Sequence, residues 1–359
     1  MAPNINITLS DQKLHFTLSN VNVSIANALR RTALMDIKTP VFLEKDMEFI
    51  TNTSRLHNEI LKQRLASIPI HVNDMEIPLD NYSVEIIKKN EGGSIEYVTT
   101  GDFKIKNIKN DKYLTEKEVQ RIFPPNPITK DFILFARLRP KITKDVPGEK
   151  IDIRAKMSIS SAKENGMYNV LSTMSYGNTV DPVSQDQAWK KYFKQLEKLE
   201  IEPEQLQLEK TNWENHRGKR YFMENSFDFI VETLGNYSNE EIIKKSCEIL
   251  MEKLNLIVKN SEQFIYKESE TNMSNCYDII LKNEDYTIGK VIEGILYDDY
   301  FNNSELISYV GFSKKHPHDN DSIIRIAFNK ETAPDKIYPL ISECCLKGIE
   351  IFKHISSSF

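Results

Sequence analysis

Apolar residues along the chain recur with two different periods, and the mixture predicts an α+β protein. Alternating apolar positions predict strands over residues 6–16 and 227–233. Four-residue steps predict a helix that is capped by Ser24 and stops before Pro40. Short alternating runs between about 44 and 185, such as 82–87 and 151–159, predict a second domain inserted into the first.

A helix that begins after residue 238 carries a narrow apolar stripe. Its apolar residues follow one another in steps of four and three, which suits packing along another helix. We predict that this seam packs against a final helix that starts near Pro334. The seam residues are Ile243, Cys247, Leu250, Leu254 and Ile257 on the first helix, and Ile341, Cys344 and Phe352 on the last.

The pattern restarts after a polar stretch at 261–274, which we interpret as a linker. A strand over 276–281, a helix capped by Thr287, strands over 307–312 and 322–328 and the final helix follow. This last unit repeats the outline of the first, without a repeat of individual residues. The charged segment 185–208 predicts a helix with an aromatic edge, interrupted at Pro203.

Composition and charge favour protein contacts over nucleic acid. The 359 residues carry a formal net charge of −5, whereas a free nucleic-acid binder usually has a basic surplus. No apolar run approaches the roughly 20 residues that cross a bilayer. The four cysteines form no CxxC pair, so we expect free thiols in a reducing, intracellular setting.

Candidate catalytic chemistry is sparse. His316 and His318 flank a proline on a turn, and a metal-dependent hydrolase around them is one alternative function. No HExxH, GxxxxGK[ST], GxGxxG or GxSxG motif is present. We therefore expect no catalytic residue, no metal and no cofactor. A free nucleic-acid-binding protein and a homo-oligomeric scaffold also stay open.

Several motifs resemble the alpha-like subunits of multisubunit RNA polymerases. The segment from Ala26 to Arg31 resembles their first helix, and Asn52-Thr53-Ser54 with the residues that follow resembles their next motif. Three positions depart from the family, because Asn58 stands for the usual Asp, Ala66 for the usual Gly, and His318 for the usual apolar residue after His-Pro. The last unit resembles their smaller partner, through 287–289, 310–312 and His316-Pro317.

The resemblance implies a fused pair of dimerisation partners, equivalent to the third-largest and eleventh subunits of RNA polymerase II. The fold is then an alpha-subunit-like dimerisation domain with an inserted mixed α/β domain, fused to a second, smaller dimerisation unit. The long helices would pack as an intramolecular pseudo-dimer. The implied boundaries are 1–43 with 221–260, then 44–220 for the insertion and charged segment, 261–274 for the linker, and 275–359.

The resemblance also implies partners. The chain would be a non-catalytic assembly platform that docks the second-largest polymerase subunit, contacts small accessory subunits and the largest subunit, and touches nucleic acid and membrane little or not at all. The family's motifs place the partner interface at Arg30, Arg31, Glu59 and Arg64. A planar guanidinium suits such interface pairing.

Fusion of both partners resembles the polymerases of cytoplasmic large DNA viruses, and most closely that of African swine fever virus. This resemblance implies one copy per polymerase, a role in viral transcription, and a location in the host cytoplasm and the virion.

Overall fold

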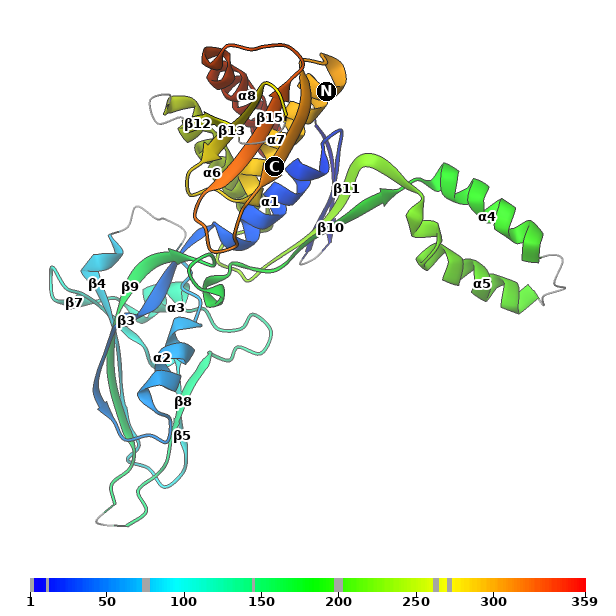
Figure 1. Cartoon of the computed structure of the whole chain (residues 1–359). Helices are drawn as coiled ribbons and strands as arrows, with labels where there is room; N and C mark the ends of the chain where they lie inside the picture. Colours follow the sequence, from blue (N-terminus) through cyan, green and yellow to red (C-terminus); the bar gives the residue numbers. More distant parts are fainter. Residues whose placement is uncertain are drawn as a thin grey trace. The chain divides into compact units, whose positions relative to one another are not determined.

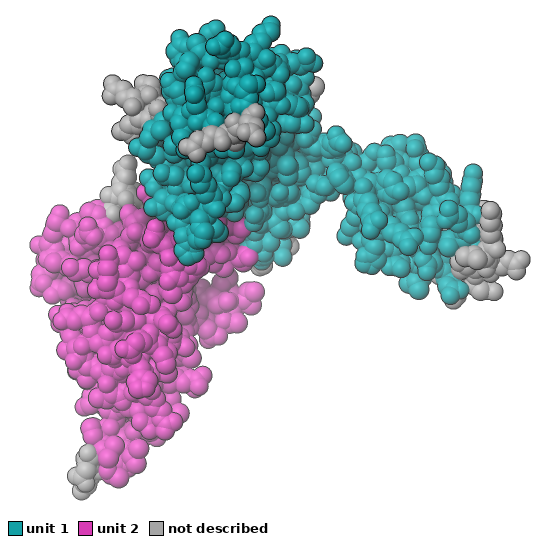
Figure 2. Space-filling model, in the orientation of Figure 1, with its two compact units in different colours: residues 1–33, 173–232, 239–359 teal, residues 34–172, 233–238 magenta. Residues whose placement is uncertain are grey.

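The computed structural model describes residues 3–10, 13–72, 78–143, 146–196, 203–260, 265–269 and 273–359. The chain folds into two compact units, coloured separately in Figure 2. Unit 1 contains residues 1–33, 173–232 and 239–359, and unit 2 contains residues 34–172 and 233–238. No described helix is long and apolar enough to serve as a membrane span.

These units divide the chain differently from the boundaries that we expected. The insertion begins at Leu34 rather than residue 44, because the strand after the first helix pairs inside unit 2. It ends at Ser172 rather than residue 220, because the charged segment belongs with unit 1. Of the predicted first domain, residues 1–33, 221–232 and 239–260 lie in unit 1, together with the whole predicted last domain.

The first sheet of unit 1 has the strand order β1-β2-β11-β10. The single strand predicted over 6–16 is wrong, since this stretch forms two antiparallel strands. Ile7 lies opposite Phe16, so the apolar alternation continues in phase from one strand to the next. The turn between them lies outside the described residues. The bounds are Asn4–Ser10 for β1, Lys13–Ser19 for β2, Leu171–Val180 for β10 and Phe222–Thr233 for β11.

The second sheet of unit 1 has the strand order β12-β13-β15-β14, which matches the first sheet position by position. The described part of the predicted linker contains strand β12, which pairs with β13 along the sheet edge, so that part is not a linker. Residues 261–264 and 270–272 of that prediction lie outside the described residues. The bounds are Ile265–Glu268 for β12, Cys276–Leu281 for β13, Ile307–Ser313 for β14 and Ser322–Phe328 for β15.

The helices of unit 1 complete the repeat (Figure 1). The order β2-α1-β10-β11-α6 in the first half returns as β13-α7-β14-β15-α8 in the second. Buried positions correspond as well, since Ile25 and Leu29 on α1 match Ile288 and Ile292 on α7. The bounds are Val23–Met35 for α1, Asn239–Lys259 for α6, Tyr286–Leu296 for α7 and Ile337–Ser356 for α8.

The start of each short helix differs by two residues from the prediction. The side chain of Asn22, not Ser24, accepts a hydrogen bond at the start of α1, from the Ser24 amide. Asp285, not Thr287, caps α7 in the same way. Asx side chains are strong N-caps because they satisfy amides that the helix leaves unpaired.

Helix α1 ends before Pro40, as predicted, but Pro40 itself lies in strand β3 (Lys38–Asn52). Strand β3 is at the edge of its sheet. A proline is tolerated there because one side of an edge strand donates no ladder hydrogen bond.

Unit 2 is built on a sheet with the order β3-β9-β4-β6-β7 and a separate pair, β5-β8. Leu61 and Leu65 on α2 and Phe135 on β8 are buried in its core. The strands predicted over 82–87 and 151–159 are confirmed. The remaining bounds are Asn58–Ala66 (α2), Tyr82–Lys89 (β4), Glu96–Thr99 (β5), Lys104–Asn107 (β6), Lys112–Tyr113 (β7), Glu116–Ile122 (α3), Leu134–Leu138 (β8) and Lys150–Ser161 (β9).

The charged segment forms a helical hairpin of α4 (Pro182–Leu196) and α5 (Pro203–Asn215), drawn in green in Figure 1. Pro203 begins the second helix, which fits the preference of proline for the first turn. The Trp189 and Trp213 rings lie 5.4 Å apart, so aromatic contacts hold the two helices together.

Candidate protein-interaction site

The first helices of the two halves meet through Arg31. Its guanidinium donates to the Thr287 hydroxyl at 3.0 Å and to the Asp285 carboxylate at 3.0 Å. Asp285 also caps α7, so one carboxylate orders the start of α7 and binds α1. Arg31 does not point into solvent, as a solvated helix face would require.

A corresponding contact lies at the other end of the helix pair. The Asn22 side chain donates to Asp298, just after α7, at 3.3 Å. A Cβ atom on Gly294 would lie 2.6 Å from the Ser24 hydroxyl oxygen, so only glycine allows this approach. Ser24 matches Thr287 in the repeat, and Asn22 matches Asp285. The start of each helix therefore packs against the other helix.

A cavity of about 610 Å³ opens between these two helices. Asn27 and Arg31 line it from α1, and Lys290, Glu293 and Gly294 line it from α7. The apolar rim is open to solvent, because Val23, Tyr286 and Tyr297 keep exposed fractions of 51%, 49% and 45%. A partly apolar hollow of this kind, lined by two helices, fits an inserted protein side chain.

The charges around the cavity are largely paired within the chain. Lys290 pairs with Glu293, and Arg31 pairs with Asp285. Burial alone would raise the pKa of Asp285, but hydrogen bonds from Thr287 and the charge of Arg31 lower it below its usual value. Burial raises the pKa of Asp298 despite its bond from Asn22. The rim therefore offers apolar surface more than free charge.

The four residues predicted for a partner interface lie in different surroundings. Arg30 is half-buried and donates to the Asn27 side chain on its own helix. Arg31 donates hydrogen bonds to Thr287 and Asp285 of the second half. Arg64 donates at 2.7 Å to the carbonyls of Leu134 and Phe135, which ties α2 to β8 inside unit 2. Glu59 is exposed on α2. Arg30 and Arg31 thus belong to unit 1, and Glu59 and Arg64 belong to unit 2.

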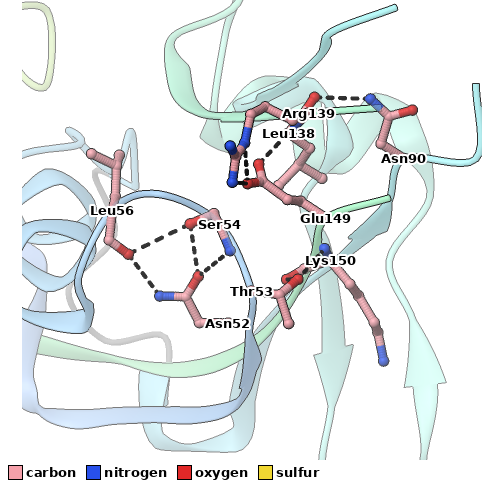
Figure 3. Close-up of polar contacts among 9 residues, drawn as sticks. All are labelled: Asn52, Thr53, Ser54, Leu56, Asn90, Leu138, Arg139, Glu149 and Lys150. Atoms are coloured by element: carbon pink, nitrogen blue, oxygen red, sulfur yellow. Dashed lines mark hydrogen bonds and ion pairs between the residues drawn. The ribbon is translucent and has the colours of Figure 1, made fainter. Parts of the chain in front are cut away.

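The Asn52-Thr53-Ser54 motif is a structural turn at the end of β3 (Figure 3). The Asn52 amide donates to the Leu56 carbonyl and to the Asn58 side chain, both at 2.8 Å. Its oxygen accepts from the Ser54 amide and hydroxyl at 3.0 and 2.7 Å. The asparagine at position 58 thus still supplies the acceptor that an aspartate would offer.

A second polar cluster joins loops of unit 2 (Figure 3). The Asn90 side chain is buried and donates to the Leu138 carbonyl at 2.8 Å. The Glu149 carboxylate accepts from the Arg139 amide at 2.7 Å and from its guanidinium. A Cβ atom on Gly148 would lie 1.8 Å from the Asn90 carbonyl oxygen. This close approach of two backbone segments therefore requires glycine.

Helices α6 and α8 pack against each other across the predicted seam. Its residues are fully buried except Ile257, which is half-buried. Gly348 allows close packing, since a Cβ atom there would lie 2.9 Å from a Leu254 methyl carbon. Burial raises the pKa of the Cys247 and Cys344 thiols, so these cysteines act as apolar packing groups.

A family model described as the RNA polymerase Rpb3/Rpb11 dimerisation domain matches residues 15–254. The chain belongs to this family. The match covers α1, the insertion and α6 up to Leu254, and it ends before sheet β12-β13-β15-β14. The repeated topology places a second copy of the same arrangement of elements beyond the matched residues.

Relatives of this Rpb3/Rpb11-type chain are subunits of archaeal and eukaryotic polymerases. DNA-directed RNA polymerase subunit Rpo3 of Pyrococcus furiosus is 27% identical over 273 residues, covering 70% of this chain and 94% of its own. Subunit RPAC1 of RNA polymerases I and III from Saccharomyces cerevisiae is 24% identical over 298 residues, covering 69% and 84%. Human RPAC1 is 27% identical over 194 residues, covering 47% and 52%.

The residues that join the two halves lie outside the predicted site. Asn22, Asp285 and Gly294 were not singled out, although an Asx residue two positions before a Ser or Thr is a helix-start signal in both halves. Among the described residues, no group of His, Cys, Asp and Glu is arranged to hold a metal. His316 and His318 lie on an exposed turn, where His316 accepts from the His318 amide.

Proposed function

We propose that this chain is a non-catalytic assembly subunit of a DNA-directed multisubunit RNA polymerase. The match to the Rpb3/Rpb11 dimerisation domain over residues 15–254 carries the proposal. The relatives described above are DNA-directed RNA polymerase subunits, which supports it.

We further propose that the chain contains both dimerisation partners and forms an intramolecular pseudo-dimer. The identical strand order of the two sheets, the repeated helix positions and the packing of α6 on α8 support this arrangement. Covalent linkage gives the second half an effective concentration on the order of millimolar, so pairing does not depend on the amount of a separate partner. One copy per polymerase is then sufficient.

Within the polymerase, the surface around α1 is proposed to dock the second-largest subunit. The exposed apolar rim formed by Val23, Tyr286 and Tyr297 supports a protein contact at this place. Arg30 lies on the same helix. Small accessory subunits and the largest subunit are further proposed partners, with little direct contact to nucleic acid. The fused architecture is the reason to propose viral transcription, in the host cytoplasm and the virion.

Co-purification with the second-largest subunit of the same polymerase tests the docking proposal. We expect Val23→Glu with Tyr286→Glu to abolish co-purification, because the changes bring charges onto an apolar rim. Both positions are at the first turn of a helix, where an acidic side chain is tolerated. Arg30→Glu should weaken binding as well. Ile128→Glu, an equally polar change at an exposed position of unit 2, is the control.

Undiminished co-purification of the double variant would contradict the docking proposal.

The mass of the isolated chain tests the pseudo-dimer separately. A self-sufficient fusion is expected to be monomeric, whereas a stable homodimer would favour a homo-oligomeric scaffold.

A further inference from the structure

The connection from β10 to β11 is an addition that the second half of unit 1 lacks. In the second half, residues 314–321 join the corresponding strands, whereas residues 181–221 join them in the first half. The longer connection contains α4, α5 and a short 3₁₀ turn at Gly218–Arg220. Since the shorter connection is enough to complete the sheet, the hairpin is not required for this topology.

A packed corner forms where the hairpin returns to β11. The Asp181 amide donates to the Tyr221 carbonyl at 2.9 Å, which closes the base of the hairpin. Trp213 is buried, and its ring stacks on Tyr221 at 6.0 Å. A Cβ atom on Gly218 would lie 2.8 Å from the Trp213 ring, so the turn is tightly packed.

Cations and apolar side chains are exposed together on this corner. We define the basic corner as Arg217, Lys219, Arg220, Tyr221, Phe222 and Met223, all of which are exposed. No acidic residue occurs from position 215 to position 223. This segment therefore has a positive formal charge, whereas the whole chain has a net charge of −5.

The cations of the basic corner lack acidic partners in the part of the chain that the structure describes. Arg217 lies over the Tyr192 ring at 5.5 Å rather than beside a carboxylate. Two acidic residues of the hairpin are engaged elsewhere, since Asp186 pairs with Lys190 and Glu214 with Lys210. Lys219 and Arg220 therefore keep their charges for an external group.

We propose that the basic corner binds an acidic segment of a partner protein that also carries apolar side chains. The carboxylates of such a segment would pair with Lys219 and Arg220, and the Arg220 guanidinium can bind a carboxylate in a bidentate manner. Its apolar side chains would cover Phe222 and Met223, each 44% exposed. This contact is separate from the α1 surface and does not depend on the identity of the subunit that docks there.

The shape of the apolar part favours a polypeptide over single-stranded nucleic acid. Successive side chains of a strand point to opposite faces, so Phe222 and Met223 do not form one stacking platform. Phe222 and Met223 are each 44% exposed, so both faces of this part of β11 are open to solvent. A segment that wraps around the strand can use both faces, whereas stacked bases need one.

Fluorescence anisotropy with the full chain tests this proposal. The probe is a fluorescein-labelled synthetic peptide in which Glu alternates with Leu and Phe. We expect Lys219→Glu with Arg220→Glu to weaken its binding at least about tenfold, because two attractions become repulsions. Phe222→Ser is expected to weaken binding through the apolar part while all charges remain.

The repeat supplies a matched control. Lys314→Glu with Lys315→Glu changes the net charge equally at the corresponding connection of the second half, and should leave binding unchanged. The same peptide with Gln in place of Glu should bind wild type at least about tenfold more weakly.

Equal binding by the corner variant and the wild type would overturn the proposal, as would equal loss in the control variant. Tighter binding of an oligo-dT or oligo-uridylate probe than of the acidic peptide, lost in the corner variant, would also overturn it in favour of a nucleic-acid site.

Discussion

Arg31 and Asp285 lie 254 positions apart in the sequence, yet their side chains are separated by 3.0 Å. The contact joins the first helix of one half to the cap of the corresponding helix of the other. Both side chains are mostly buried, with exposed fractions of 26% and 32%. An ion pair in this setting is screened less by solvent than a surface pair.

A double-mutant cycle is expected to reveal coupling between these residues. Arg31→Leu and Asp285→Asn should each destabilise the protein, and the double variant should lose less than their sum. The expected coupling energy is about 1–2 kcal/mol, because the pair shares one hydrogen-bond network with Thr287. Urea unfolding measures it. Additive losses, within about 0.5 kcal/mol, would show that the two side chains act independently.

The same pair predicts a dependence of stability on pH. Burial opposes ionisation of Asp285, but its hydrogen bonds and Arg31 lower its pKa overall. A lowered pKa means that ionised Asp285 stabilises the fold above the ordinary aspartate pKa of about 3.9, and that this contribution is lost as pH falls through the lowered value. The difference in unfolding free energy between wild type and Asp285→Asn should therefore stay constant from about pH 7 to about pH 5 and shrink as pH falls further, to about pH 3 and below. A difference that grows on acidification would contradict this assignment.

Gly148→Ala is expected to destabilise unit 2 by at least about 2 kcal/mol, because the new methyl group meets the Asn90 carbonyl oxygen of another backbone segment. Backbone cannot move aside as the end of a side chain can. Gly93→Ala is the matched control, since no atom lies within 4 Å of a Cβ atom there. Thermal unfolding of both variants measures the contrast, and similar melting temperatures would refute it.

Leu254→Ala is expected to cost about 2–5 kcal/mol, because Leu254 is fully buried between α6 and α8. Gly348→Ala should also destabilise the wild-type protein. Its cost should be smaller in the Leu254→Ala background, because the shortened side chain no longer meets the new methyl group. Leu346→Ala, at an exposed position of α8, should stay within about 0.5 kcal/mol of wild type. Chemical denaturation of the three single variants and of the Leu254→Ala, Gly348→Ala double variant measures these losses. Strictly additive losses in the double variant would contradict the predicted contact.

Local sequence patterns predicted several strands correctly where apolar and polar residues alternate along the chain. The alternation over 151–159 identified β9, and Phe227, Phe229 and Val231 are buried on β11. Gly235, between β11 and α6, has a φ of 101°, a left-handed conformation that favours glycine. The strand over 6–16 was mispredicted because an in-phase hairpin and a continuous strand show the same alternation.

The sequence by itself determined the class of fold, the helical seam stripes and the lack of recognisable catalytic motifs, because these depend on spacing along the chain. Only the tertiary structure showed that Arg31 is used inside the protein, that Arg64 holds a sheet edge, and that the two sheets share one strand order. Such contacts join residues far apart in sequence, and tertiary packing decides which residues meet. The spacing of apolar residues along the chain therefore cannot predict these contacts.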